Sequence, residues 1–245
     1  MPKRVTMPDD HQLCCLDLGC GTSPLPNFVG VDRFPLAGVC VVADLDRLPL
    51  PFADSCADAI YACHSLEHVD DLLGVMEEIW RIGKSGARVV IVAPCGAQGL
   101  NLANPYHKQY FNEHSPRFWT SEFEGNVPPV EYHHPPHGTS WGLSLSDHGR
   151  AKLDLRCQRI EFLHFDEYRN LSPAKQRYLR RRHHDVCDQI IYELVVHKSN
   201  AGGGAAESVE IRFPAWLEAR RGALQRPWRG RMGRWWRALR TRLHP

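Results

Sequence analysis

Five short apolar runs in the first hundred residues limit the possible folds more than any other feature of the chain. They lie at residues 13–18, 28–31, 38–43, 57–62 and 87–93, and their length and flanking turns predict buried strands. Residues 70–81 have helical spacing, and the glycines at 83 and 86 are expected to end that helix. Apolar strands that alternate with crossovers predict a parallel sheet covered on both faces.

The remainder of the predicted domain is less regular. Residues 98–150 are rich in His, Pro, Asn and aromatic side chains, which is typical of an irregular substrate or lid insertion. Residues 156–165 and 189–197 predict two more strands, joined by a basic stretch at 172–184 and paired antiparallel at one sheet edge. We therefore expect residues 1–200 to form an α/β domain, a three-layer Rossmann-like sandwich. Its seven-stranded sheet should be mostly parallel, with an antiparallel edge strand.

Residues 201–245 differ in character from the predicted domain. Residues 201–206 are small and predict a linker, and the rest is a basic Arg/Trp-rich tail with amphipathic helical spacing. The segment carries ten arginines and three glutamates, a net +7, whereas the first 200 residues carry a net −5. Three interpretations stay open: peripheral contact of residues 212–243 with an anionic membrane, packing on the chain's own acidic domain, and, least favoured, nucleic-acid binding.

Composition indicates an ordinary globular protein. No apolar run approaches the ~20 residues of a membrane span. The basic N-terminus is not followed by the apolar segment of a secretory signal, so we expect a cytoplasmic location, or a peripheral one at the inner membrane face if the tail binds lipid. The nine cysteines form no C-x-x-C pair and are expected to be free thiols.

Three features at the ends of successive predicted strands indicate a ligand site. Gly19 and Gly21 follow the first strand, although a lone G-x-G is equally typical of a tight turn. Asp32 ends the second strand and Asp44 the third. The carboxyl ends of parallel strands meet at one edge of a sheet. One carboxylate there can accept two hydrogen bonds from a ribose diol, and the other can hold an adenine amino group beside the N–H of Leu45.

A nicotinamide or flavin dinucleotide is disfavoured at this site. The G-x-G-x-x-G pattern needs a third glycine, and Pro24 occupies that place. The acidic residue should follow about 20 residues later, and Asp32 comes much sooner.

Four segments resemble the successive motifs of class I S-adenosylmethionine-dependent methyltransferases. They are LDLGCG at 16–21, GVD at 30–32, ADLDRLPLPFADSCADAIYACHSLEHV at 43–69 and RIGKSGARVVIVAP at 81–94. More narrowly, they are similar to a bacterial subgroup linked to polysaccharide or surface-glycan gene clusters. The resemblance implies S-adenosyl-L-methionine as the cofactor and a small-molecule or glycan acceptor methylated on oxygen. Two departures are a short interval between the glycines and Asp32, and K-S-G-A in place of K-P-G-G at 84–87.

The resemblance also implies roles for individual residues. His64 would border the methyl group and the acceptor. Asp32, with Arg33 beside it, would bind the ribose, and Asp44 and Leu45 the adenine. The methionine part would be cradled by Asp17, Gly19, Cys20 and Gly21.

A hydroxyl acceptor needs a general base with a pKa near neutral, and histidine meets that requirement. The candidates are His64, His68 and His107, with His114 as a competitor. Structural hydrogen bonds, at a helix start for His68 and in a lid loop for His107, are the alternative interpretations.

No metal site is predicted. His133, His134 and His137 are more typical of a solvated loop, although Glu113 and His114 leave a metal-assisted variant open. A catalytically silent methyltransferase-like protein acting through its tail is the alternative function. Another acceptor class, such as a natural product, a lipid or nucleic acid, is a further one. Nucleic acid is disfavoured because the segment after the fourth strand, ACHSLEH, is not the N/D-P-P-Y/F type.

Overall fold

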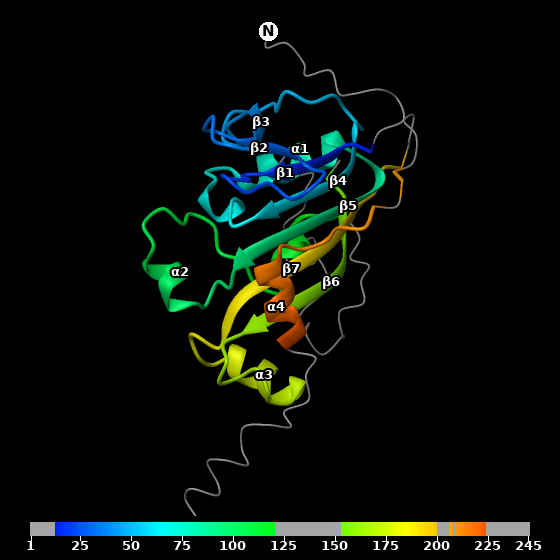
Figure 1. The fold of residues 1–245 in the computed structure, drawn as a ribbon. Helices are drawn as coiled ribbons and strands as arrows, with labels where there is room; N and C mark the ends of the chain where they lie inside the picture. Colours follow the sequence, from blue (N-terminus) through cyan, green and yellow to red (C-terminus); the bar gives the residue numbers. More distant parts are fainter. Residues whose placement is uncertain (1–12, 121–152, 200–205, 208, 224–245) are drawn as a thin grey trace, which may run out of the picture.

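A seven-stranded sheet with the order β3-β2-β1-β4-β5-β7-β6 forms the centre of the computed structural model (Figure 1). The structure describes residues 13–120, 153–199, 206–207 and 209–223. Strands β1 to β5 are mutually parallel, and β7 runs antiparallel to both of its neighbours, β5 and β6. The strands are β1 (Cys15–Leu18), β2 (Val29–Asp32), β3 (Val39–Val42), β4 (Ala57–Cys63), β5 (Gly83–Pro94), β6 (Leu155–His164) and β7 (Cys187–Val196).

This topology confirms the predicted fold class. The two late strands pair antiparallel at one edge of the sheet, as expected. The strand that runs opposite to its neighbours is β7, which lies between β5 and β6, so β6 is the edge strand.

Four α-helices and two 3₁₀ turns are described. The helices are α1 (Leu72–Ile82), α2 (Gly99–Ala103), α3 (Pro173–Arg180) and α4 (Ala215–Ala223), and the turns are η1 (Leu66–His68) and η2 (Ser115–Phe118). The Asp71 carboxylate caps α1 by accepting the N–H of Gly74 at 2.9 Å. As expected, α1 ends at Gly83, its C-cap residue. The following strand, β5, begins at this same glycine and not at the expected residue 87.

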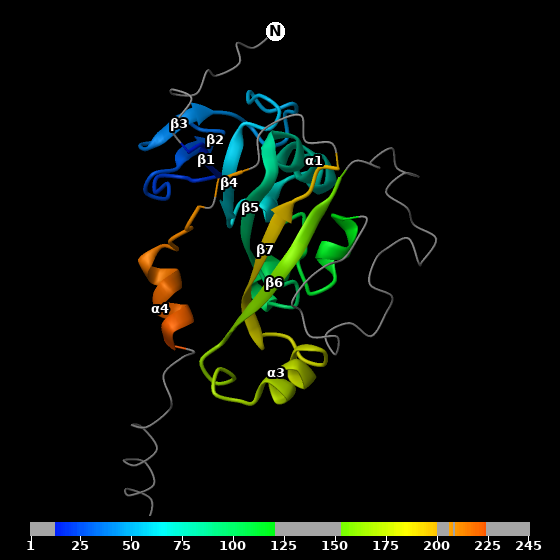
Figure 2. The same cartoon turned by 90° about the vertical axis from the view of Figure 1, so that its right-hand side faces the viewer.

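The two faces of the sheet are covered by different parts of the chain. Successive strand residues point to opposite faces, so Ile60 packs in the core that α1 covers, and Tyr61 packs in the second core. Figure 2 shows α1 and α4 on opposite sides of the sheet. The second core is completed from the C-terminal segment by Val209, Ile211, Phe213 and Leu217, all of which are buried. The sheet, the layer that contains α1 and the layer formed by the C-terminal segment are the predicted three layers.

The described part of the C-terminal segment packs on the preceding domain, which is one of the three interpretations that the sequence left open. This part contributes side chains to the second core, and Arg221 donates to both carboxylate oxygens of Glu161, at 2.9 to 3.2 Å. The spacing of its apolar residues predicted an amphipathic tail but did not indicate which of its side chains would be buried. The amphipathic pattern from Trp228 onward lies outside the described residues, as do His133, His134 and His137.

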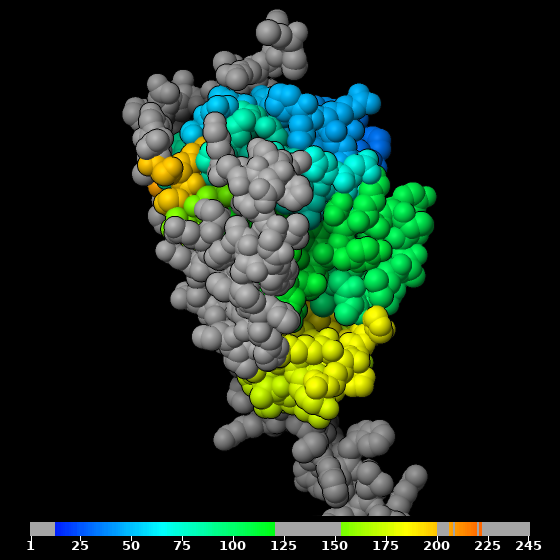
Figure 3. Space-filling view, turned by 180° about the vertical axis from the view of Figure 1, so that it is seen from behind, coloured from blue at the N-terminus to red at the C-terminus, as the bar shows by residue number. Residues whose placement is uncertain are grey.

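Short connections join β1, β2 and β3 at one end of the molecule, and α3 lies at the other end (Figures 1 and 3). Neither connection contains a helix within residues 19–38, which confirms that the first crossover is reduced. The loops pack tightly, because a Cβ on Gly30 would lie 2.8 Å from the Gly38 carbonyl oxygen. All nine cysteines are free, as expected. Within the described part of the chain, every helix is too short or too polar to span a membrane.

Candidate active site

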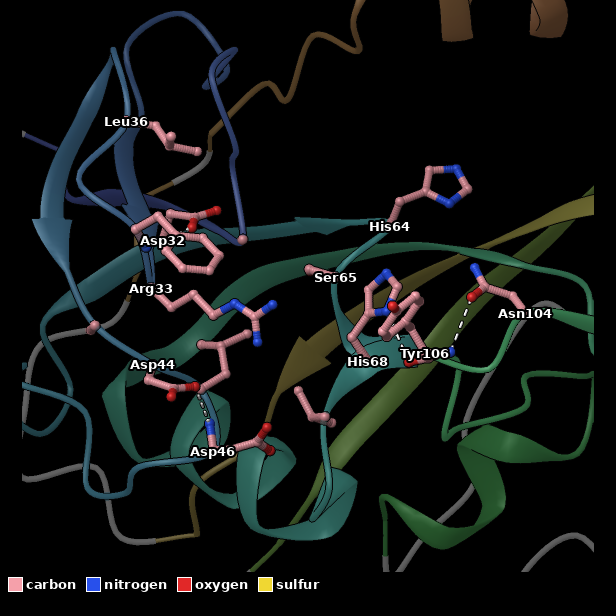
Figure 4. A pocket seen from close by; sticks show the side chains of 15 residues that line it. Asp32, Arg33, Leu36, Asp44, Asp46, His64, Ser65, His68, Asn104 and Tyr106 are labelled. Carbon is pink, nitrogen blue, oxygen red and sulfur yellow. Dashed lines mark hydrogen bonds between the residues drawn. The ribbon is translucent and has the colours of Figure 1, made fainter.

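A cavity of about 490 Å³ opens at the carboxyl ends of β1 to β4. Its walls come from the loops that follow these four strands and from the loop after α2. Figure 4 shows Asp32, Arg33 and Asp44 on one side and His68 and Tyr106 on the other. Six predicted site residues line it, namely Gly19, Asp32, Arg33, Asp44, Leu45 and His64, together with the predicted base His68.

Gly19 allows the loop after β1 to pass close to the segment after β4. It has φ +72°, and a Cβ at this position would lie 2.3 Å from the Cβ of Ser65. The Ser65 hydroxyl donates to the Leu18 carbonyl at 2.8 Å and fixes the two segments together. A glycine is therefore required by both conformation and space.

Asp32 organises the same loop while it faces the cavity. Its Oδ2 accepts the N–H of Gly21 at 3.0 Å, and its Oδ1 accepts the N–H of Phe34 at 2.9 Å. Each carboxylate oxygen can accept a second hydrogen bond. Asp32 can therefore bind a diol without losing the contacts that hold it in place.

Asp44 lies two residues after β3 and lines the cavity on the same side as Asp32 (Figure 4). Its Oδ1 accepts the N–H of Asp46 at 3.1 Å, and Arg47 lies 3.7 Å from its other oxygen. Three carboxylates, those of Asp32, Asp44 and Asp46, line the cavity against one guanidinium, that of Arg33. This balance disfavours phosphate groups and favours a ligand that carries positive charge.

Three predicted cofactor residues lie behind the cavity wall. Asp17 is buried, accepts the N–H of Leu25 at 2.8 Å, and has its pKa raised to about 6 by burial. Cys20 packs against Gly30, and burial raises the pKa of its thiol to about 11, so the thiol is neutral. Gly21 contacts Asp32 through its N–H. These residues shape the loop and do not line the cavity.

His64 follows β4 with an unusual backbone conformation. Its φ is +51°, a region that residues other than glycine rarely occupy and that is often found at functional sites. Its Nδ1 lies 3.3 Å from Oε1 of Glu67, and its ring centroid lies 6.3 Å from that of Trp216 on α4. The described C-terminal segment thus reaches the edge of the site.

The other candidate histidines separate into two groups. The His68 and His107 rings meet edge to face, with centroids 4.7 Å apart, next to the buried Glu67. Burial lowers the pKa of His107, which favours the neutral imidazole. His114 instead lines a second cavity beside the N-terminal end of α1. The structure therefore brings His64, His68 and His107 together and leaves His114 out.

Several lining residues carried no signal in the sequence. Phe34 and Leu36 follow Asp32 in a short loop, while Asn104 and Tyr106 come from the loop after α2. Tyr106 reaches the site because the N–H groups of Lys108 and Gln109 both donate to the Glu67 carbonyl, at 2.7 and 3.1 Å. That contact spans about forty residues of sequence and has no local pattern.

Residues 16–91 match a known family described as a methyltransferase domain. The matched stretch contains the glycine turn, Asp32, Asp44 and the segment from His64 to His68. It ends before the loop that carries Tyr106 and His107.

Two methyltransferases are similar to part of the chain. A sterol 4-C-methyltransferase of Caenorhabditis elegans is 29% identical over 99 residues, which are 31% of this chain and 30% of the relative. A cycloartenol-C-24-methyltransferase of Oryza sativa subsp. japonica is 30% identical over 78 residues, 32% of this chain and 23% of the relative. The chain therefore spans less than a third of the length of either relative.

Solved structures with weak overall similarity include one bacterial and one archaeal protein. A putative S-adenosylmethionine-dependent methyltransferase from Listeria monocytogenes has a TM-score of 0.44 at 12% identity, over 78% of this chain and 93% of that one. A SAM-dependent methyltransferase from Archaeoglobus fulgidus has a TM-score of 0.43 at 17% identity, over 76% and 86%. Similarity at this level has no bearing on the reaction.

S-adenosylmethionine fits the chemistry of this cavity. The ligand has a ribose diol, an adenine, a sulfonium cation and no phosphate. Asp32 and Asp44 match the first two groups, and the excess of carboxylates matches the cation. The backbone at Gly19 and the absence of a third loop glycine at Pro24 fit a ligand without pyrophosphate.

Proposed function

We propose that this chain is an S-adenosylmethionine-dependent methyltransferase that methylates a hydroxyl group of a sugar, a glycan or a related small metabolite. One observation carries the proposal. Gly19 after β1, Asp32 at the end of β2, Asp44 after β3 and His64 after β4 all line one cavity. When bound, S-adenosylmethionine supplies a methyl group on a cationic sulfur, which needs no further activation as a leaving group.

The residues of the chain then have to bind the methyl donor, orient the acceptor against it and remove the proton of the acceptor hydroxyl. Asp32 holds the ribose hydroxyls, while Asp44 and the N–H of Leu45 hold the adenine, so the donor is fixed along the strand ends. Orientation of two reactants in this way can lower a barrier by about 7–11 kcal/mol in favourable cases. The acceptor enters between His64, His68 and the loop that carries Tyr106.

The histidine group supports a hydroxyl acceptor. A hydroxyl becomes a good nucleophile when its proton is removed during the reaction, and a neutral imidazole is suited to that task. His64 and His68 line the cavity, and His107 contacts His68.

An apolar, sterol-like acceptor is the second candidate. The names of the two similar methyltransferases suggest it, and the cavity is lined in part by exposed apolar side chains. Phe34 is 52% exposed, Leu36 39% and Tyr106 73%. Methylation assays with sugar-nucleotide and sterol acceptors, followed by mass spectrometry, separate the two acceptor classes.

Calorimetry with S-adenosylhomocysteine, the demethylated product, tests cofactor binding directly. The intact chain should bind one equivalent. Asp32→Ala should weaken binding by about 100-fold or more, because two charge-assisted hydrogen bonds are worth roughly 3 kcal/mol together. Asp166→Ala is the matched control, since this carboxylate is exposed and follows β6 at the far end of the sheet. No binding by the folded chain would refute the proposal.

A further inference from the structure

Three potential metal ligands meet at the edge of the cavity. One ring nitrogen each of His68 and His107 and a carboxylate oxygen of Glu67 lie within 4.8 Å of one another. Glu67 and His68 belong to η1, which begins three residues after the end of β4, and His107 belongs to the loop after α2. The two hydrogen bonds from residues 108 and 109 to the Glu67 carbonyl hold these segments together, so the cluster is built into the fold.

The histidine rings are oriented by protein acceptors on their Nδ1 sides. His68 Nδ1 lies 3.1 Å from the carbonyl oxygen of Tyr106, which can only accept, so Nδ1 carries the hydrogen. His107 Nδ1 lies 2.5 Å from Oδ1 of Asn101, a buried side chain whose amide nitrogen donates to the Cys95 carbonyl. Both rings therefore present an unprotonated Nε2. This is the arrangement in which metal-ligating histidines are usually held.

Glu67 adds a buried negative charge to the two lone pairs. Its side chain is 1% exposed, and its Oε1 lies 4.0 Å from His68 Nε2. Among the described residues, its Oε2 has no hydrogen-bond partner. Its Oε1 lies 3.3 Å from Nδ1 of His64. Three acceptors that converge in this way are unfavourable without a donor or cation between them.

We propose that Glu67, His68 and His107 bind a divalent first-row transition-metal ion. Two imidazoles and one carboxylate suit Zn²⁺, Mn²⁺, Fe²⁺ or Co²⁺, whereas Mg²⁺ and Ca²⁺ prefer oxygen ligands. An ion at about 2.1 Å from each ligand atom draws the three side chains slightly closer together.

Three protein ligands leave coordination positions open, as in catalytic metal sites. His68 lines the same cavity as Asp32, Asp44 and His64, so the open positions face the proposed acceptor space. A bound ion would lower the pKa of an acceptor hydroxyl at these positions. With His68 and His107 engaged as ligands, His64 would be the cavity-lining imidazole left to take the proton. This acceptor role rests on the proposed function, whereas metal binding itself does not.

Metal titration of the full chain tests the proposal without any measurement of activity. The protein is dialysed against EDTA, freed of chelator and titrated with Co²⁺, with visible absorption and calorimetry as the two signals. We expect one equivalent to bind. Glu67→Gln and His107→Ala should each weaken binding by at least about 100-fold, more than the loss of an outer hydrogen bond costs. Asn101→Leu, which removes the outer bond to His107 together with the bond to the Cys95 carbonyl, should cost about 10–100-fold.

Controls separate ligand loss from misfolding and from other histidines. His183→Ala should bind Co²⁺ like the wild type, and each variant should keep the circular dichroism spectrum of the parent. His68→Ala serves as the second ligand variant, because this side chain is 42% exposed and its loss should not prevent folding. A combined His133→Ala, His134→Ala, His137→Ala variant should also keep its site.

Three outcomes would overturn the inference. They are the absence of stoichiometric Co²⁺ binding, binding that survives in both Glu67→Gln and His107→Ala, and binding that is lost in the His133, His134 and His137 variant. Parallel titration with S-adenosylhomocysteine distinguishes the two proposals. Cofactor binding without metal binding refutes the metal site alone, and metal binding without cofactor binding refutes the proposed function alone.

Discussion

The C-terminal segment should be essential for folding, and deletion tests this directly. A chain that ends at Glu207 loses four side chains of the second core, those of Val209, Ile211, Phe213 and Leu217. A chain that ends at Ala223 keeps all four. The two deletions form a matched pair, because both remove the segment from residue 224 onward.

The magnitude follows from burial. Each of the four side chains is at most 9% exposed, and complete burial of such a group contributes about 1.5–3 kcal/mol. Their sum is roughly 6–12 kcal/mol as an upper estimate, comparable with the whole stability of a typical domain, about 5–15 kcal/mol. The shorter chain should therefore fail to fold, and it would also expose Tyr61 and its neighbours on the sheet.

Thermal melting followed by circular dichroism measures the effect. The chain of residues 1–223 should melt close to the full-length protein, and the chain of residues 1–207 should show no cooperative transition or should aggregate. Leu217→Ala in the 1–223 chain should cost about 2–5 kcal/mol. A chain of residues 1–207 that melts within a few degrees of the full-length protein would refute the reasoning.

Three further predictions concern the cavity and its support. Gly19→Ala should weaken S-adenosylhomocysteine binding strongly, because the added Cβ would clash with Ser65. A Cβ on Gly21 would have no atom within 4 Å, so Gly21→Ala should show only the cost of a positive φ, about 1–2 kcal/mol. Equal losses of binding free energy for the two variants in calorimetry would contradict this prediction. Asp17→Asn should stabilise the protein at pH 7 by up to ~3 kcal/mol and flatten its stability between pH 4 and 6. Burial raises the pKa of Asp17 in the folded state from an ordinary value near 3.8 to about 6, so ionisation of this carboxyl between these pH values favours unfolding. Denaturant melts across pH measure the free energy of unfolding of both proteins. If that free energy depends on pH between 4 and 6 equally in the variant and the wild type, the prediction is wrong. Arg81→Ala should lower stability by about 3–5 kcal/mol, because its guanidinium joins Glu78, Asp54 and the carbonyls of the loop before β4; a loss below 1 kcal/mol in urea melts would count against that role.

The parts of the fold that could be predicted from sequence depend on local pattern. Apolar runs that stop at Asp32 or near Asp44 mark strand ends, and parallel strands bring their carboxyl ends to one edge of the sheet. The positions of Gly19, Asp32, Asp44 and His64 around one cavity follow from those two facts. The start of β5 at Gly83 was missed because a helix can lead into a strand through a single glycine.

The parts that could not be predicted depend on contacts between distant segments. The burial of Leu217 against β4 and β5 has no signal in a tail whose most obvious feature is its arginines. The Glu67, His68 and His107 cluster needs a loop forty residues away to return to η1. A motif search along the chain finds Glu67 and His68 as neighbours, but only the fold supplies His107.

A crystal structure of the chain with S-adenosylhomocysteine tests the central claim most directly. The account predicts the ribose hydroxyls on Asp32, the adenine beside Asp44 and Leu45, and the sulfur directed toward His64. A ligand bound away from these strand ends, or a cavity that stays closed to it at saturating concentration, would contradict the account.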